Sequence, residues 1–282
     1  MTKISVVLAV RNEEANIGKC LDSVKDIADE IVIVDEYSTD KTVEIAKEYG
    51  ARVILEPHHE IFHITKQKAL DAATGNWILL LDADEVVTPE LGKEIRETIE
   101  NGPIPGKLNK LFERHQKLIE KRDGPIGEKT GEVVAYFIPR LNMFLGRPLI
   151  HAGVYPDPAI RLVRKGKAHF TGKSVHDIMK IKGEIGWLSN HMLHNDSPTL
   201  KRYFIRLNRY TDLHAGELKE KKVPKNLFYL IFVYSFFKPL YIFLNLFFRH
   251  KGFLDGISGF LWSMFSAMHY PIAYFKYWTK QL

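Results

Sequence analysis

Short apolar runs alternate with helical patterns through the first hundred residues of this chain. The runs that predict buried strands are Ile4–Val10, 31–35, Arg52–Leu55 and Trp77–Leu81. Each is rich in aliphatic side chains, too short for a buried helix, and followed by polar residues. Between the runs, apolar residues recur at helical spacing, and Thr88-Pro89-Glu90 has the residue types that begin a helix. Strands of this kind separated by helices predict an α/β fold, with a mostly parallel sheet covered by helices on both faces.

The pattern changes after residue 100. Residues 101–131 are charged and interrupted by Gly and Pro, with a short helix predicted around 108–119. Strand-like sequence returns at 132–145 and again at 160–164, where apolar and charged residues alternate. We therefore expect a variable insertion between two halves of one α/β domain.

A strongly apolar segment lies near the carboxyl end. Of the 22 residues of 227–248, 18 are apolar, and Lys238-Pro239 interrupts them near the middle. A helix of this length is long enough to cross a bilayer, but a charge at the midplane costs about 3 kcal/mol on insertion scales. We favour a re-entrant or interfacial helical hairpin at the membrane over a transmembrane span, and a span over a buried soluble core.

Charge is distributed unevenly along the chain. The formal net charge is +6, yet residues from Lys201 onward carry 13 Lys and Arg against 4 Asp and Glu. The same region holds most of the aromatic residues, with 19 of 33 between Lys225 and Leu282. Basic, aromatic and aliphatic residues together indicate an anionic membrane surface and argue against a nucleic-acid partner. The single cysteine, Cys20, excludes an intrachain disulfide and a cysteine-based zinc site.

Aspartates that could bind a ligand or a metal stand at the ends of two of the predicted strands. Asp82-Ala83-Asp84 comes directly after one, and Asp35 ends another. Ligands of parallel sheets bind at the carboxyl ends of the strands. Two carboxylates at i and i+2 can reach one divalent cation, which in turn binds a diphosphate. A polar turn with a capping acid is the alternative. Neither a Gly-x-Gly-x-x-Gly sequence nor a Walker loop is present, which argues against dinucleotide and P-loop folds.

Several segments together resemble the family 2 glycosyltransferases, whose nucleotide-sugar-binding fold is of the GT-A type. Those that carry the resemblance are 5–13, 34–42, 66–77 and 81–85. Six later segments are similar to the lipopolysaccharide-core β-glucosyltransferase subgroup, namely 144–147, 155–157, 161–166, 175–177, 208–211 and 252–256. The resemblance covers most of the chain except about 101–131.

The resemblance implies roles for individual residues on the donor side. It places the following residues at the nucleotide-sugar donor: Ala9, Arg11, Glu13, Asp35, Lys66 and Asp82. It implies a Mg²⁺ or Mn²⁺ ion held by Asp84 with Asp82, and His194 is a further candidate ligand. For Arg11 and Lys66 taken alone, a solvated charge is the ordinary alternative.

Transfer with inversion needs a general base that deprotonates the acceptor hydroxyl. Asp177 is the candidate, in a Val-His-Asp sequence where the subgroup usually has Val-His-Glu, and Asp157 and Asp196 are its rivals. Arg161 and Arg164, with His176, are expected to bind a phosphorylated acceptor or the diphosphate, although a solvated cationic strand edge is equally compatible with the pattern.

The resemblance predicts an inverting, metal-dependent glycosyltransferase that moves a sugar, expected to be a hexose on UDP, to a lipid-linked or lipopolysaccharide-type acceptor. It would work at the cytoplasmic face of the cell membrane. A polyprenyl-phosphate sugar synthase and a catalytically silent membrane scaffold are the alternatives. The corresponding segments are a donor half (1–100), an insertion (101–131), an acceptor and catalytic half (132–200) and membrane-associated helices (201–282).

Overall fold

The computed structural model describes residues 2–102, 109–172 and 179–279. The chain forms two compact units. The sheet unit comprises Met1–Arg140 and Pro156–His194, and the helical unit comprises Leu141–Tyr155 and Asn195–Leu282. Residues 141–155 thus group with the carboxyl-terminal helices rather than with the strands on either side of them in the sequence.

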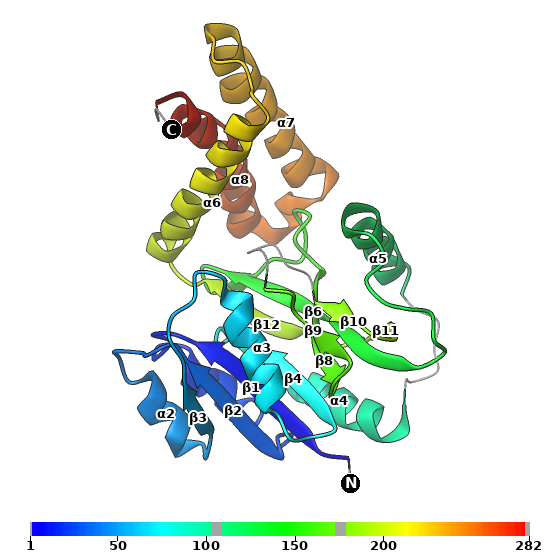
Figure 1. Ribbon diagram of the computed structural model, residues 1–282. Helices are drawn as coiled ribbons and strands as arrows, with labels where there is room; N and C mark the ends of the chain where they lie inside the picture. The colour runs from blue at the N-terminus through cyan, green and yellow to red at the C-terminus, as the bar shows by residue number, and fades with distance from the viewer. Residues whose placement is uncertain (1, 103–108, 173–178, 280–282) are drawn as a thin grey trace. The chain divides into compact units, whose positions relative to one another are not determined.

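A mixed sheet forms the centre of the sheet unit (Figure 1). Its strands run in the order β3-β2-β1-β4-β8-β6-β12-β5, and β11 and β7 also pair with β6. Their bounds are β1 (Ile4–Val10), β2 (Glu30–Asp35), β3 (Arg52–Leu55), β4 (Trp77–Leu81), β5 (Glu85–Val87), β6 (Val133–Phe144), β7 (Arg147–Pro148), β8 (Asp157–Arg164), β11 (Glu184–Trp187) and β12 (Met192–Ser197). A separate pair joins β9 (Ala168–His169) to β10 (Lys180–Ile181). All four predicted amino-terminal strands are confirmed, and they are mutually parallel.

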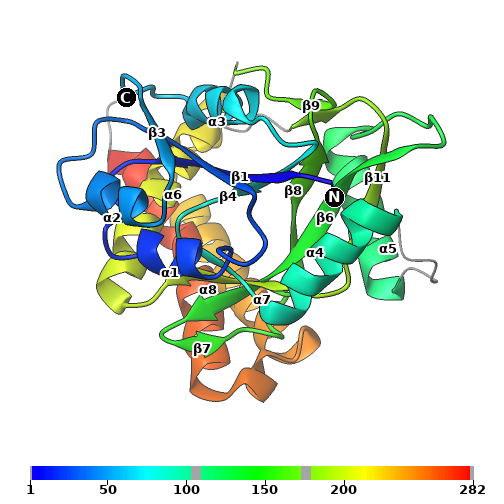
Figure 2. The ribbon, with the colours of Figure 1, turned by 90° about the horizontal axis from the view of Figure 1, so that it is seen from below.

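The sheet is covered on both faces, as the sequence predicts (Figure 2). On one face it packs against α1 (Ile17–Asp22), α2 (Thr42–Glu48) and α4 (Pro89–Asn101). On the other it packs against α3 (Phe62–Ala72) and the β9–β10 pair. The helix α4 begins as expected, because the Thr88 side chain accepts a hydrogen bond from the amide of Leu91 and Pro89 occupies the first turn. Within the predicted insertion lies α5 (Lys110–Asp123).

Strand register aligns the carboxyl ends of the central strands. Val10 on β1 lies opposite Asp35 on β2, and Leu8 on β1 lies opposite Leu81 on β4. The β4–β8 pair is antiparallel, with Leu79 opposite Leu162, so the first residues of β8 lie beside the end of β4. Residues far apart in the sequence therefore meet at one edge of the sheet.

The helical unit is built from α6 (Leu200–Glu220), a long apolar helix and α8 (Gly256–Thr279). The long helix consists of π-helical η1 (Tyr229–Phe237), α7 (Lys238–Leu244) and π-helical η2 (Asn245–Arg249), and the short η3 (Gly252–Asp255) joins it to α8. Two clusters hold the unit together. Tyr234 and Tyr274 stack in one, and Phe144 packs against Tyr203 and Trp262 in the other.

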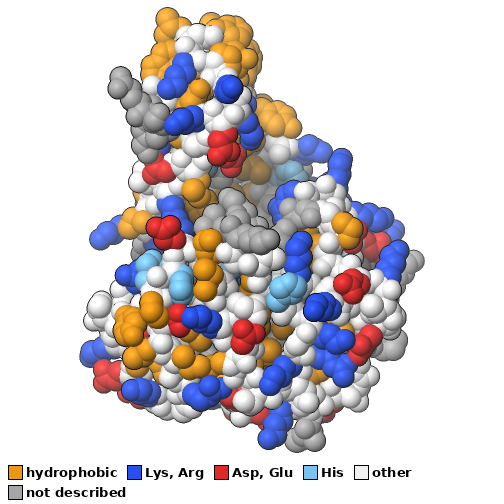
Figure 3. Space-filling model, in the orientation of Figure 1, with side chains coloured by type: hydrophobic (Ala, Val, Ile, Leu, Met, Phe, Trp, Pro, Cys, Tyr) orange, Lys and Arg blue, Asp and Glu red, His pale blue; other side chains and the backbone are white. Residues whose placement is uncertain are grey.

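Among the described residues, one helix, Tyr229–Arg249, is long and apolar enough to cross a membrane, by length and composition only. Just 6% of its most apolar window is buried, and hydrophobic side chains gather on the surface of this unit with Lys and Arg beside them (Figure 3). Lys238 is not an isolated charge in this helix. Its Nζ lies 3.9 Å from the centroid of the Tyr234 ring and 5.8 Å from that of Tyr270, so cation–π contacts stabilise it.

Gly75 precedes β4 and fits closely against β1. A Cβ atom at this position would lie 2.8 Å from the Ser5 backbone nitrogen and 3.0 Å from the Lys3 carbonyl oxygen. We expect Gly75→Ala to lower the free energy of unfolding by about 1–3 kcal/mol, because backbone atoms cannot move aside as a flexible side chain can.

Urea unfolding measures this effect. Gly216→Ala is the matched control, since a Cβ there meets nothing within 4 Å and Gly216 lies within α6, where Ala is favoured over Gly by about 1 kcal/mol. Equal stability of the Gly75→Ala and wild-type proteins would contradict the close approach.

Candidate active site

The carboxylate of Asp82, directly after β4, is held by two cations. Lys66 Nζ lies 2.6 Å from Asp82 Oδ1, and Arg161 Nη2 lies 2.5 Å from Asp82 Oδ2. Lys66 comes from α3 and Arg161 from β8, and both side chains are buried. Burial opposes ionisation of Asp82, but Arg161 and then Lys66 outweigh it and hold its pKa well below the usual range. Asp82 is therefore an anion that the protein itself has neutralised.

Glu85 completes this network, and the sequence analysis did not select it. It is fully buried at the start of β5, and Arg161 Nη2 lies 2.6 Å from its Oε1. Arg140 Nη1 lies 3.4 Å from the same oxygen, and the Asp82 amide donates to the other carboxylate oxygen at 3.0 Å. The position of Glu85 directly after Asp84 was the available signal, but the residue also begins a strand, where acidic side chains are commonly solvated.

Asp84 lies in a different electrostatic environment from Asp82. Its pKa is raised to about 6, first because burial removes its carboxylate from water and then because Asp82, Glu85 and Glu13 are negative neighbours. His194 Nε2 lies 3.7 Å from Asp84 Oδ1, and β12 brings His194 opposite Glu85. The two carboxylates of the Asp-Ala-Asp sequence thus differ, one compensated by cations and the other crowded by anions.

The carboxylates at this edge are of the kind that a divalent cation binds. An added positive charge would offset the burial and the repulsion that together raise the Asp84 pKa, whereas Asp82 is already contacted by Lys66 and Arg161. Among the described residues, no group of three or more His, Cys, Asp or Glu side chains is arranged to hold a metal.

The other residues expected to bind the nucleotide-sugar donor lie at or near the ends of β1 and β2. Ala9 is buried in β1, whereas Arg11 is exposed just beyond it. Asp35 is fully buried and accepts hydrogen bonds from the backbone amide and the hydroxyl of Ser38, at 2.8 and 2.5 Å. The Glu13 carboxylate accepts a hydrogen bond from Asn16. Asp35 therefore shapes the loop that follows β2.

A second buried acid beside Asp35 was also missed in the sequence. Glu36 is 2% exposed, and its carboxylate accepts a hydrogen bond from the Thr65 hydroxyl. The other carboxylate oxygen lies 2.6 Å from His58 Nδ1. Because Thr65 is next to Lys66 on α3, Glu36 ties the end of β2 to the helix that carries Lys66.

The two arginines of β8 do not form the shared cationic edge that the sequence suggested. Arg161 is buried against Asp82 and Glu85, whereas Arg164 is exposed and pairs with Glu132. The β6–β8 register shifts between Tyr136 and Phe137, opposite Arg161, so regular alternation along β8 is broken there.

The candidate bases lie in different places. Asp157 pairs with Arg140, with 2.7 Å between Asp157 Oδ2 and Arg140 Nη2. Asp196 belongs to the helical unit and pairs with Arg206. The first candidate, Asp177, and its neighbour His176 lie outside the described residues.

A family model and several curated relatives indicate one enzyme class. Residues 5–106 match the model of the family described as glycosyl transferase family 2. An uncharacterized glycosyltransferase of Rickettsia typhi is 29% identical over 276 residues, which cover 95% of this chain and 84% of that protein. LpsC of Rhizobium meliloti, a lipopolysaccharide core biosynthesis glycosyltransferase, is 28% identical and covers 94% of this chain and 88% of its own length.

Solved structures resemble the chain more distantly. Glucosyl-3-phosphoglycerate synthase of Mycobacterium tuberculosis, in complex with Mn²⁺, UDP and glucosyl-3-phosphoglycerate, matches with a TM-score of 0.41 and 16% identity. The match covers 79% of this chain and 81% of that one. At this degree of similarity, the roles of the site residues are inferred from the geometry of this chain alone.

Proposed function

We propose that the chain, whose residues 5–106 match the glycosyl transferase family 2 model, is a glycosyltransferase of the GT-A fold type that transfers a sugar from a nucleotide donor to a lipid-linked saccharide. The observation that carries this proposal is the pair of unlike carboxylates after β4. Asp82 is compensated by Lys66 and Arg161, whereas Asp84 remains crowded by negative charge. A site of this kind accepts a cation together with the diphosphate that the cation binds.

The donor would bind along the carboxyl ends of β1, β2 and β4. Ala9, Arg11 and Glu13 would line the base and ribose pocket, with Asp35 as a hydrogen-bond acceptor beside them. Lys66 would place positive charge near the diphosphate. UDP is the proposed nucleotide, and a hexose the proposed sugar.

Asp84, with Asp82, would hold Mg²⁺ or Mn²⁺. When bound, the ion would supply neutralisation of the charge on the departing nucleoside diphosphate. The chain's own contribution is to keep Asp82 ionised and fixed in position through Lys66 and Arg161. His194, on the adjacent β12, is a further candidate ligand.

Inversion at the sugar carbon requires a base on the acceptor side. We assign this role to Asp177, on its resemblance to the corresponding acid of the lipopolysaccharide-core subgroup. Both rivals have cationic partners in the structure, Arg140 for Asp157 and Arg206 for Asp196.

The acceptor is proposed to be presented by a membrane. The helical unit leaves large apolar side chains in contact with solvent, for example Phe228, Phe232 and Phe237, each about half exposed. Lys221, Lys222 and Lys225 precede this surface, and Arg249 and Lys251 follow it. Interfacial aromatic residues and flanking cations suit a monotopic or re-entrant attachment at the cytoplasmic face. The name of LpsC agrees with a lipopolysaccharide-type acceptor.

Donor binding is expected to require a divalent cation held chiefly by Asp84. Asp84→Asn keeps the side-chain size and removes the charge, so UDP affinity in the presence of Mn²⁺ should fall about a hundredfold or more. The wild-type affinity should also fall as the pH drops below about 6, because protonation of Asp84 competes with the metal.

Calorimetric titration of UDP, with Mn²⁺ or with EDTA, measures both effects. Asp22→Asn, at an exposed carboxylate on α1 that pairs with Lys25, is the matched control and should bind normally. A wild-type affinity that is identical in Mn²⁺ and EDTA would exclude the metal role.

Asp177 is expected to act after donor binding. Asp177→Asn should leave UDP affinity nearly unchanged and lower turnover by about a hundredfold or more, because the amide cannot accept the acceptor proton. Nucleotide release with a membrane lipid extract as acceptor measures turnover. An active Asp177→Asn variant together with an inactive Asp157→Asn variant would transfer the role to Asp157.

Membrane attachment is expected to leave both ends of the apolar helix on one side. Single cysteines replacing Lys222 and Lys251 should both react with an impermeant thiol reagent from the cytoplasmic side, as should Lys47→Cys on the exposed surface of α2. Cys20 is fully buried, so the wild-type chain provides the unlabelled control. Reaction of positions 222 and 251 from opposite sides would show a transmembrane span.

A further inference from the structure

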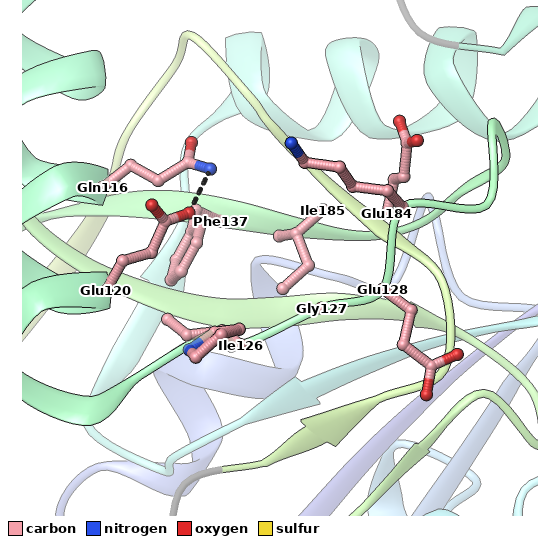
Figure 4. A pocket seen from close by; sticks show the side chains of 10 residues that line it. Gln116, Glu120, Ile126, Gly127, Glu128, Phe137, Glu184 and Ile185 are labelled. Carbon is pink, nitrogen blue, oxygen red and sulfur yellow. Dashed lines mark hydrogen bonds between the residues drawn. The ribbon is translucent and has the colours of Figure 1, made fainter.

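A cavity of about 480 Å³ lies in the sheet unit between α5, the segment that follows α5, and β11 (Figure 4). Its centre is apolar, with Ile126, Phe137 and Ile185 in its lining. In Figure 4 the carboxylates of Glu120 and Glu128 lie on opposite sides of these apolar groups. The cavity is therefore an apolar surface bordered by hydrogen-bonding groups, a combination typical of small-molecule sites.

Aromatic packing fixes one wall of this cavity. Trp187 stacks on Phe112 with 4.7 Å between ring centroids, and it lies 4.8 Å from the Phe137 ring. The Trp187 indole nitrogen donates a hydrogen bond of 2.9 Å to Gln116 Oε1. Gln116 in turn donates from its amide nitrogen to Glu120 at 3.0 Å. The polar groups at this wall are thus oriented before any ligand arrives, which lowers the entropic cost of binding.

The charge of the lining is negative. Three carboxylates, Glu120, Glu128 and Glu184, border the cavity together with the single cation Lys129. Carboxylates accept hydrogen bonds from hydroxyl groups and ammonium groups, and they repel phosphate. The lining therefore suits a sugar that is neutral or carries an amine, and disfavours a phosphorylated one.

The cavity lies on the same face of the sheet as Lys66. Ile185 packs in the apolar cluster beneath α3. Phe137 lies two residues after Ala135 of the same cluster on β6, and residues two apart on a strand share one face. Phe137 lies opposite Ile160 on β8, and β8 is the neighbour of β4. Two strand spacings, about 10 Å, therefore separate β6 from β4, the strand that Asp82 follows, and β11 lies one spacing beyond β6. A chain of two or three sugar units can cover such a distance.

We propose that this cavity is a subsite for a saccharide unit of the acceptor, and that it selects a unit without phosphate. The inference rests on the proposed function, because an acceptor is needed only if the chain transfers a sugar. It assigns the predicted insertion a role in acceptor choice, since Gln116, Glu120, Ile126 and Glu128 all come from that segment.

Binding of small probes to the full-length protein tests the proposal. A glucosamine disaccharide represents the favoured class and glucose 6-phosphate the disfavoured one, and saturation-transfer NMR and calorimetry measure their binding. We expect the wild-type protein to bind the disaccharide and to exclude the phosphate. Glu128→Gln should weaken the disaccharide about tenfold, the usual effect of removing one hydrogen bond to a charged group.

Two further variants separate the cavity from the rest of the fold. Ile185→Trp fills the cavity and should abolish disaccharide binding, while Glu113→Gln, on α5 but outside the cavity lining, should bind as the wild type does. UDP affinity in Mn²⁺ should be unchanged in all three variants, because none of these side chains lies at the β4 edge.

Failure of the disaccharide to bind a wild-type protein that binds UDP would overturn the subsite. Equal weakening by Glu113→Gln, or displacement of the disaccharide by UDP alone, would also overturn it. Absence of UDP binding with intact disaccharide binding would instead overturn the proposed function, and the acceptor role with it. The two failures are therefore distinguishable.

Discussion

The site depends on the ion-pair network around Asp82. Its carboxylate meets Lys66 and Arg161, and Arg161 also binds the fully buried Glu85. Desolvation of so many charges is costly, and removal of one partner from such a network leaves an uncompensated charge that destabilises the fold by several kcal/mol. The network also joins α3, β4, β5 and β8, so it fixes the sheet edge at which the donor is proposed to bind.

The same network determines why the two neighbouring aspartates behave differently. Asp82 is paired with two cations, whereas burial and then the negative charges of Asp82, Glu85 and Glu13 raise the pKa of Asp84 to about 6. The two aspartates differ because the folded sheet places cations beside Asp82 and carboxylates beside Asp84.

The helical unit is stabilised differently, because its two buried apolar clusters are built largely from aromatic side chains. Tyr234 and Tyr274 stack, and the hydroxyl groups of Tyr274 and Tyr277 donate to the carbonyls of Pro224 and Val223. Residues 141–155 contribute Phe144 and Leu149 to this unit. The carboxyl-terminal helices are consequently part of a larger folded body, whose outer surface remains apolar.

Local sequence patterns determined the elements of the fold. The four amino-terminal strands, the start of α4 at Thr88 and the position of Asp82 and Asp84 at a sheet edge follow from runs and spacings within a few residues. The apolar character of Tyr229–Arg249 follows in the same way, since composition alone decides it.

The tertiary structure determined which residues pair with the charged side chains. Arg161 and Asp82 are 79 residues apart, and Arg161 and Glu85 are 76 apart, so their contact depends on strand order and on the register shift opposite Arg161. In the sequence, Arg161 and Arg164 look like two equivalent cations of one strand, and Glu85 is marked only by its position directly after Asp84. The cation–π partners of Lys238 likewise come partly from α8. The physical reason is common to all of these: hydrophobic periodicity is a property of neighbouring residues, whereas the partner of a buried charge is set by chain segments that only the folded sheet or helix bundle brings together.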